Sequence, residues 1–232
     1  MEVIMDRGLR QIVDAWIPYA LPIVTLTGCA FCLRVYLCLP SKSSRAKKDA
    51  PLGGKGSNVK TMIYFGSGGH TAEMIRLIRR LDPAKYSPML FAIGHTDISS
   101  IDKVRCSNLE LETSAKWLRV FRNREVKQSW FTTVFTSLWS LVQAFYVILR
   151  SKPQLLICNG PGTCVSLCYS AFMLRVFGVA HTRIVFVESF CRTEGLSLSG
   201  KLLLPIADRF IAQWPELVEI SPAKIEYLGV IC

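Results

Sequence analysis

Acidic side chains are scarce in this sequence. Seventeen Asp and Glu stand against 28 Lys and Arg, which gives a net charge of +11, while half of the 232 residues are apolar. A basic surface favours an anionic partner such as nucleic acid, anionic lipid or a phosphorylated substrate. The high hydrophobicity, and the absence of the Arg- and aromatic-rich strand signatures of RNA-binding modules, favour a membrane and argue against nucleic acid.

Patterns typical of metal sites and disulfides are also lacking. The sequence has three histidines, and its nine cysteines are an odd count. Cys158, Cys164 and Cys168 lie in apolar runs, where buried free thiols are common. Cys29 and Cys32 form C-x-x-C without a second pair, which disfavours a redox or zinc role. We expect no metal and no cofactor, and the cysteines fit a reducing compartment.

One long run near the N-terminus has no charge at all. Residues 15–33 read AWIPYALPIVTLTGCAFCL, and 19 residues are about the length of a helix that crosses a hydrocarbon core. A cleaved signal peptide is the alternative, but acidic and basic residues precede the run and no small-residue cleavage site follows it. We therefore predict a transmembrane anchor over residues 15–39, after a short N-terminal segment over residues 1–14.

The charges around this run predict its orientation. Those before it nearly cancel, whereas those after it are basic: Arg34, Lys42, Arg45, Lys47 and Lys48. The positive-inside rule places residues 1–14 in the lumen and residues 40 onward in the cytosol. Residues 40–58 are polar and rich in Gly and Ser, which is typical of a flexible linker. Residues 59–232 then form the cytosolic domain.

Strand-like and helical patterns alternate from residue 59 onward. Strands are predicted at residues 59–65, 88–93, 108–113, 154–158, 183–188 and 208–213, and helices at 70–81, 129–150, 163–177 and 197–205. This alternation predicts an α/β, Rossmann-like fold, a mostly parallel sheet with helices on both faces. Residues 184–187 are continuously apolar, as in a strand that is covered on both faces.

A second uncharged run, residues 128–149, is also long enough to span a membrane. Thr132, Thr136, Ser140 and Gln143 form a polar stripe at helical spacing, and a crossing here would divide the sheet. We predict an amphipathic helix that packs on the sheet or lies on the bilayer surface. The basic residues before it fit either a solvated face or anionic headgroups: Lys116, Arg119, Arg122, Arg124 and Lys127.

A glycine loop follows the first predicted strand. It reads Gly66-Ser67-Gly68-Gly69-His70. Glycine lets backbone N–H groups approach a ligand, and the start of the following helix favours an anion. The nicotinamide fingerprint does not fit, since Thr71 replaces its third glycine and no acidic residue follows the second strand. The loop predicts an anion site in which His70 binds a phosphate oxygen or acts as a general base.

Two more motifs follow predicted strands. They are Asn159-Gly160-Pro161-Gly162-Thr163 and Glu188-Ser189-Phe190-Cys191-Arg192. Ligands of open α/β sheets bind outside the carboxyl ends of the strands, so the three motifs predict one wide anion-binding crevice. A carboxylate, a hydroxyl and a guanidinium at a strand end also suit a sugar or a phosphate.

These motifs are part of a larger set. Residues 65–73, 158–164, 187–192, 196–201, 211–217 and 227–229 carry it in order. Over about residues 59–232, and in its anchor, the sequence closely resembles the membrane-anchoring subunit of the eukaryotic UDP-N-acetylglucosamine transferase of the dolichol-linked oligosaccharide pathway.

The resemblance implies the acceptor half of a split GT-B glycosyltransferase. In that family a separate soluble subunit binds UDP-GlcNAc. The pair adds the second GlcNAc to GlcNAc-diphosphodolichol on the cytosolic face of the endoplasmic reticulum. The chain is then expected to be inactive alone. The alternative is a non-catalytic membrane recruiter with vestigial loops.

The resemblance also implies site residues. Related single-chain bacterial transferases carry a Gly-Gly-His loop that faces the acceptor diphosphate. By that similarity the diphosphate is bound by Gly66, Ser67, Gly68, Gly69, Asn159, Gly160, Gly162, Thr163 and Arg192. His70 and Glu188 are alternative candidate bases. The C-terminal tail docks on the soluble partner through Tyr227, Leu228, Gly229, Val230 and Ile231.

Overall fold

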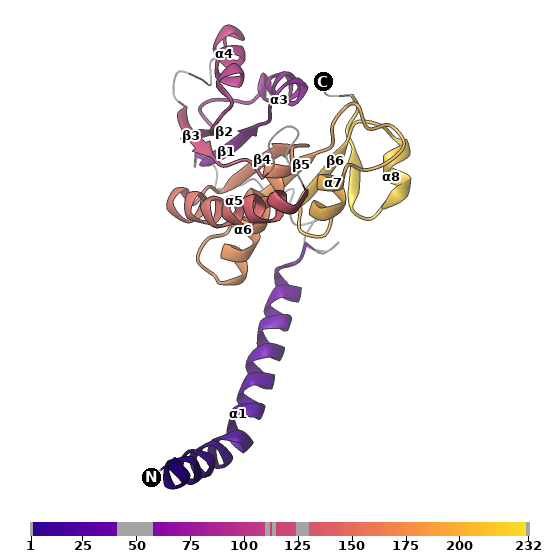
Figure 1. Cartoon of the computed structure of the whole chain (residues 1–232). Coiled ribbons are helices and arrows are strands. Elements are labelled where there is room, and N and C mark those ends of the chain that lie inside the picture. The colour runs from indigo at the N-terminus through magenta and orange to yellow at the C-terminus, as the bar shows by residue number, and fades with distance from the viewer. Residues whose placement is uncertain (1, 41–57, 110–111, 113–114, 124–129, 231–232) are drawn as a thin grey trace. The chain divides into compact units, whose positions relative to one another are not determined.

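The computed structural model describes residues 2–40, 58–109, 112, 115–123 and 130–230, in two units that divide after Leu39. The first unit is a single helix, α1 (Glu2–Cys38). Its segment Tyr19–Cys38 is long and apolar enough to cross a membrane, and none of that segment is buried (Figure 1). The predicted linker lies almost wholly outside the described residues.

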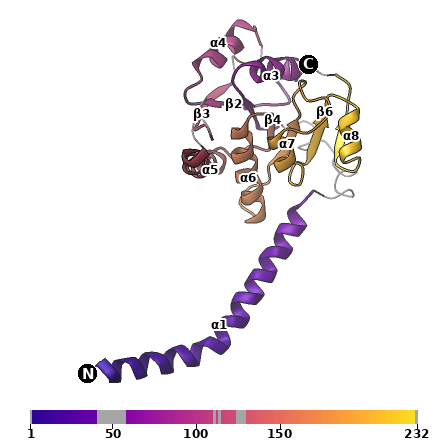
Figure 2. The same ribbon diagram turned by 45° about the vertical axis from the view of Figure 1, so that its right-hand side comes forward.

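The second unit is a parallel sheet of seven strands in the order β3-β2-β1-β4-β5-β6-β7. Helices α3 and α4 cover one face of the sheet, and α5, α6 and α7 cover the other (Figures 1 and 2). The predicted α/β fold class is therefore confirmed. The elements are β1 (Thr61–Phe65), α3 (Gly69–Ile78), β2 (Met89–Gly94), α4 (Ile98–Cys106), β3 (Lys116–Val120), α5 (Trp130–Ser151), β4 (Leu155–Asn159), α6 (Gly162–Val176), β5 (Arg183–Val187), α7 (Leu198–Leu203), β6 (Arg209–Ala212), α8 (Glu216–Ile220) and β7 (Ile225–Tyr227).

Strands β1 and β2 are almost entirely apolar, and their side chains form the core between the sheet and α3. Every residue of both strands is buried, as strands covered on both faces require. Phe65 and Phe91 meet edge to face, with ring centroids 5.0 Å apart, an arrangement worth about 1 kcal/mol beyond the buried area. Met74 of α3 packs into the same cluster. This packing fixes where β1 ends and α3 begins.

The strand predicted at residues 108–113 is wrong where the chain is described: Asn108, Leu109 and Glu112 belong to no strand, and residues 110, 111 and 113 lie outside the described residues. Asn108 has a φ of 49°, which a strand does not permit. The third strand is β3, which pairs with β2 from Lys116 opposite Leu90 onward. Because β3 is an edge strand with Lys116 and Arg119 exposed, its pattern resembles a basic surface segment. Elements α4, α8 and β7 are also absent from the prediction.

The described part of the uncharged run forms α5, as predicted, and Ser140 and Gln143 of its polar stripe face the domain, whereas the Thr132 side chain lies outside the described part. Ser140 Oγ donates to the backbone oxygen of Phe121 (2.9 Å), and Gln143 accepts from the backbone N–H of the same residue. Ala144 and Ile148 are buried beside the stripe. Residues 133–151 also meet the length and composition of a membrane span, but 17% of that segment is buried. The helix thus packs on the domain by one side and leaves an apolar side exposed.

Candidate functional site

The two glycine loops lie side by side because of the strand order. From β1 the chain proceeds to β2 and β3 on one side, and then crosses to β4 on the other side of β1. Strands β1 and β4 are direct neighbours, with Thr61 opposite Leu155. The first glycine loop (residues 66–69) follows β1, and the second (residues 160–162) follows β4. This reversal of strand order is where open α/β sheets bind their ligands.

The two loops touch so closely that two of their glycines admit no side chain. A Cβ atom on Gly66 would lie 2.1 Å from Cγ of Pro161. Gly160 has a φ of +77°, and its Cβ would lie 2.4 Å from Cε1 of His70. By contrast, a Cβ on Gly69 or Gly162 would meet nothing within 4 Å. These last two glycines therefore border open space, where a ligand can approach the backbone.

His70 stands at the start of α3, against the second glycine loop. Its side chain is 34% exposed. Its Nδ1 atom is buried, without a hydrogen-bond partner among the described residues, and lies 3.6 Å from Oε2 of Glu73. Since Nδ1 faces Glu73, Nε2 is the nitrogen that remains for a ligand or a proton.

Glu73, which the sequence interpretation did not select, connects the three motifs. Its carboxylate accepts from Ser189 Oγ (2.8 Å) and from Asn159 Nδ2 (3.3 Å). The same amide donates to the backbone oxygen of His70 (2.9 Å). Burial by itself would raise the pKa of Glu73, but the contacts with His70 and Ser189 outweigh it and lower this pKa below its ordinary value. The available signal was the spacing of His70 and Glu73, three residues apart on one helix.

A chain of buried hydrogen bonds supports the first glycine loop from below. The Thr71 hydroxyl donates its one proton to the backbone oxygen of Gly66 or to Ser100 Oγ, which lies 2.7 Å away. Ser100 Oγ donates to Asp97 (2.7 Å), whose carboxylate lies 3.3 Å from Arg122. Thr71 thus replaces the third glycine of a nicotinamide loop with a side chain that binds the loop itself.

Glu188 directly follows β5 and lies beneath the protein surface. It is fully buried. One carboxylate oxygen accepts from the backbone N–H and the hydroxyl of Ser197, each at 3.1 Å, and the other accepts from the N–H of Ser189 (3.2 Å). A Cβ on Gly200 would lie 2.2 Å from the carboxylate. This carboxylate joins the end of β5 to the start of α7, so its geometry favours a structural role over that of a base.

The remaining predicted residues separate into two groups. Ser67, Gly68 and Arg192 are exposed, and Arg192 donates its backbone N–H to the oxygen of Ser189 (3.0 Å). Asn159, the last residue of β4, and Thr163, in the first turn of α6, are buried.

The tail follows β7, where Tyr227, Leu228 and Val230 are exposed. Gly229, between them, has a φ of +90°. Ile231 lies outside the described residues. In the part of the chain that the structure describes, no group of three His, Cys, Asp or Glu side chains could hold a metal ion.

Solved structures with the same fold include MurG of Acinetobacter baumannii, with a TM-score of 0.53 at 12% identity. A UDP-N-acetylglucosamine 2-epimerase matches with a TM-score of 0.50 at 18% identity. The matches cover 74% and 69% of this chain but only 45% and 43% of those chains. The likeness supports the expected fold, a Rossmann-like half of the GT-B architecture.

Sequence comparison gives the family. The model described as "Oligosaccharide biosynthesis protein Alg14 like" matches residues 61–231. The chain is 40% identical over 202 residues to UDP-N-acetylglucosamine transferase subunit ALG14 of Yarrowia lipolytica, covering 86% of this chain and 92% of that protein. It is 44% identical over 182 residues to the subunit of the same name from Homo sapiens, covering 75% of this chain and 83% of that one. The chain belongs to the Alg14-like family of oligosaccharide biosynthesis proteins.

Proposed function

We propose that this chain is the membrane-anchored, acceptor-binding subunit of a two-subunit UDP-N-acetylglucosamine transferase. The observation that carries the proposal is the pair of glycine loops that meet at the reversal of strand order, with the half-exposed His70 between them. The curated relatives are named as subunits of such a transferase, and the match covers 82–92% of three of them.

The acceptor in this proposal is GlcNAc-diphosphodolichol. A diphosphate fits the backbone N–H groups at the starts of α3 and α6, where Gly69 and Gly162 border open space. The net charge of +11 also favours an anionic ligand. The apolar segment of α1 would keep the domain at the membrane that holds the lipid acceptor.

His70 is the general base in this reaction. An acceptor hydroxyl gives its proton to Nε2 while its oxygen bonds to the anomeric carbon of the donor sugar. The bond between that carbon and UDP breaks, and UDP leaves with the electron pair. The Glu73 carboxylate, 3.6 Å from Nδ1, favours a proton on that nitrogen through its negative charge, so that Nε2 keeps its lone pair. A positioned base of this kind contributes about 10²–10⁴ in rate.

The proposed partner is a soluble subunit that binds UDP-GlcNAc and docks on the C-terminal tail. Tyr227, Leu228 and Val230 are apolar and exposed, which suits a docking segment. The proposed location is the endoplasmic reticulum membrane, with residues 1–14 in the lumen and residues 59–232 in the cytosol. The basic residues that follow the apolar run support this orientation.

The test is a transfer assay on the full chain in detergent, with UDP-GlcNAc and GlcNAc-diphosphodolichol. We expect no turnover from this chain alone, turnover after addition of the cytosolic protein that co-purifies with it, and loss of turnover on deletion of residues 227–232. Strong turnover by the isolated chain would contradict the division into two subunits.

The rival function is a membrane recruiter without a role in binding the acceptor. It is tested with Gly69→Ala and His70→Ala in the same complex. We expect both variants to retain the partner in a pull-down and to lose transfer. Full transfer by both would make the loops vestigial.

Orientation is tested separately by adding protease to sealed microsomes. We expect residues 59–232 to be digested. Their protection would place the domain in the lumen and overturn the proposed orientation.

A further inference from the structure

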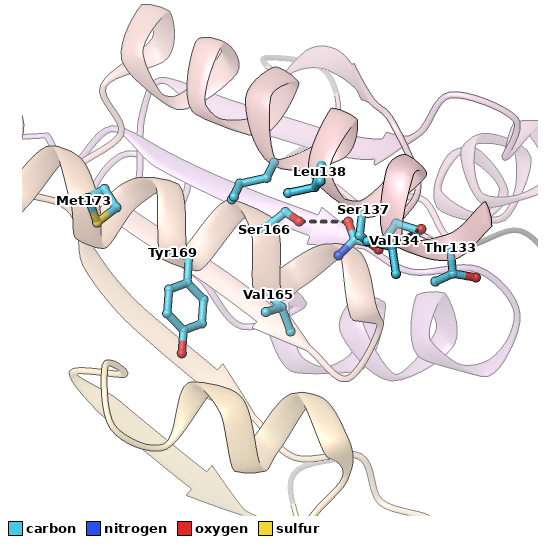
Figure 3. Close-up of a pocket in the computed structure, with 10 residues that line it drawn as sticks. Thr133, Val134, Ser137, Leu138, Val165, Ser166, Tyr169 and Met173 are labelled. Atoms are coloured by element: carbon cyan, nitrogen blue, oxygen red, sulfur yellow. Dashed lines mark hydrogen bonds between the residues drawn. The ribbon is translucent and has the colours of Figure 1, made fainter. Parts of the chain in front are cut away.

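A groove of about 760 Å³ opens between α5 and α6, on the opposite face of the sheet from α3 (Figure 3). Its volume is in the range of sites that hold small molecules, about 300–1,000 Å³. Val134 and Leu138 from α5 and Val165 and Tyr169 from α6 line the groove. The full lining is Asn123, Thr133, Val134, Ser137, Leu138, Leu141, Val165, Ser166, Tyr169 and Met173.

The polar end of the groove is joined to the second glycine loop by one residue, Asn123. Its side-chain amide donates to the backbone oxygen of Gly162 (3.1 Å), and its backbone N–H donates to Thr163 Oγ1 (3.4 Å). Its side-chain oxygen accepts from Ser140 (2.6 Å) and Ser166 (2.9 Å). The polar end of the groove therefore adjoins Gly162 and Thr163, two of the residues that would hold a diphosphate.

Away from Asn123 the groove is apolar and uncharged. None of its lining residues is Asp, Glu, Lys, Arg or His. On its rim Val134 and Leu138 remain 59% and 57% exposed. Exposed apolar side chains that gather on one rim favour an apolar occupant, since covering them removes them from water. An uncharged, mainly apolar lining is complementary to a neutral hydrocarbon and not to a phosphate.

We propose that this groove binds the isoprenoid chain of the acceptor lipid, in the units next to the diphosphate. The inference rests on the proposed function. An amphiphile whose diphosphate lies at the starts of α3 and α6 presents its hydrocarbon end beside Asn123, and the change from polar to apolar along the groove matches the change along that ligand. Binding of the chain adds affinity to the acceptor in proportion to the apolar surface that the groove covers.

The test compares two acceptors with the complex in detergent. Both carry GlcNAc-diphosphate, one on a chain of several isoprene units and one on a single unit. Val165→Trp places a large ring in the groove. The matched control is Val142→Trp, the same change at a residue of α5 that is 62% exposed and does not line the groove.

We expect Val165→Trp to raise KM for the long acceptor at least about tenfold, the factor that corresponds to a loss of about 1.4 kcal/mol in binding. KM for the short acceptor should stay unchanged, which also shows that the variant is folded. Val142→Trp should behave as wild type with both acceptors. An unchanged KM of Val165→Trp for the long acceptor would overturn the proposal, and equal effects of the two variants would indicate a bilayer-facing surface instead.

The same assay separates this inference from the proposed function. If the wild-type complex transfers to neither acceptor, the proposed function fails and the groove proposal falls with it. If the wild type transfers to both acceptors with the same KM, the function stands and the groove has no part in binding the chain.

Discussion

His70 and Glu188 were selected from the sequence for the same reason, but they lie in opposite environments. Each is a titratable side chain just beyond the end of a parallel strand. His70 is 34% exposed and its Nε2 remains for a ligand. Glu188 is fully buried, and its carboxylate accepts three hydrogen bonds. A side chain whose hydrogen-bonding capacity is used within the protein stabilises the fold. One with capacity to spare, at the surface of a crevice, is the better candidate for chemistry.

The largest effect is expected at Gly160, where the second glycine loop lies against His70. Gly160→Ala requires a left-handed residue that costs about 1–3 kcal/mol, and it places Cβ 2.4 Å from the His70 ring. Both the melting temperature of the full chain in detergent and the transfer rate of the complex should fall. Gly162→Ala is the control for stability, since its Cβ meets nothing. A stable, active Gly160→Ala variant would mean that the two loops do not touch as described.

Next in size is the loss of the proposed base. His70→Ala should lower kcat by about 10²–10⁴ and leave the melting temperature unchanged, because the half-exposed ring contributes little burial. Circular dichroism melts and single-turnover transfer measure the two quantities on the same preparation. A loss of kcat below threefold would remove His70 from the chemistry.

Glu188→Gln should show the opposite result. The two oxygens of the Glu188 carboxylate together accept three hydrogen bonds. Glutamine replaces one of these oxygens with an amino group that can only donate, which costs about 1–3 kcal/mol of stability. Transfer per folded molecule should stay near that of wild type. If Glu188→Gln instead melts normally and loses kcat as His70→Ala does, the assignment of the base is reversed.

A smaller effect is expected at Glu73. Its carboxylate lies beside His70 and accepts a hydrogen bond from Ser189, the residue that follows Glu188. Glu73→Gln should lower kcat about tenfold while KM stays constant, since it loosens the orientation of a base that is still present. Glu73→Asp, which restores the charge, should recover part of the loss. Equal kcat for wild type and Glu73→Gln would show that Glu73 does not position His70.

The smallest effect is a dependence of stability on pH. The pKa of Glu73 is lower in the folded chain than its ordinary value, which is about 4.3. The ionised carboxylate therefore stabilises the fold above that pH, and the contribution is lost as the pH falls through the lowered pKa. The difference in melting temperature between wild type and Glu73→Gln should be present at pH 7, shrink as the pH falls below the ordinary pKa of about 4.3, and vanish below the lowered pKa of the folded chain. A difference independent of pH would indicate a loss of packing alone.

The sequence predicted the sheet well wherever strands are buried. Residues 62–65 and 184–187 lie in strands because an uninterrupted apolar run can be covered on both faces, and Cys158, Cys164 and Cys168 are buried as expected. The same rule failed at β3, where exposed Lys116 and Arg119 alternate with half-buried residues. An edge strand is defined by a neighbour on one side, and its own residues give little sign of it.

The sequence predicted the glycine loops of the candidate site but not the side-chain contacts that join them. Two glycine loops and their adjacency follow from strands that precede helices. That Glu73 rather than Glu188 faces the histidine depends on side chains from α3, β4 and β5, which come together only after the sheet has formed. No local pattern encodes which of two carboxylates is buried with its partners satisfied.

The strand order also has a consequence for how the chain folds during its synthesis. The pairing that joins the two glycine loops brings together segments whose hydrogen-bonded ends, Lys60 and Gln154, are 94 residues apart in the chain. A contact of that separation pays a large loop-closure entropy and forms slowly relative to local contacts. On the ribosome, the first glycine loop must therefore wait, unpaired, until about ninety further residues have been synthesised and β4 has emerged. A truncated product that ends before β4 lacks the second glycine loop altogether.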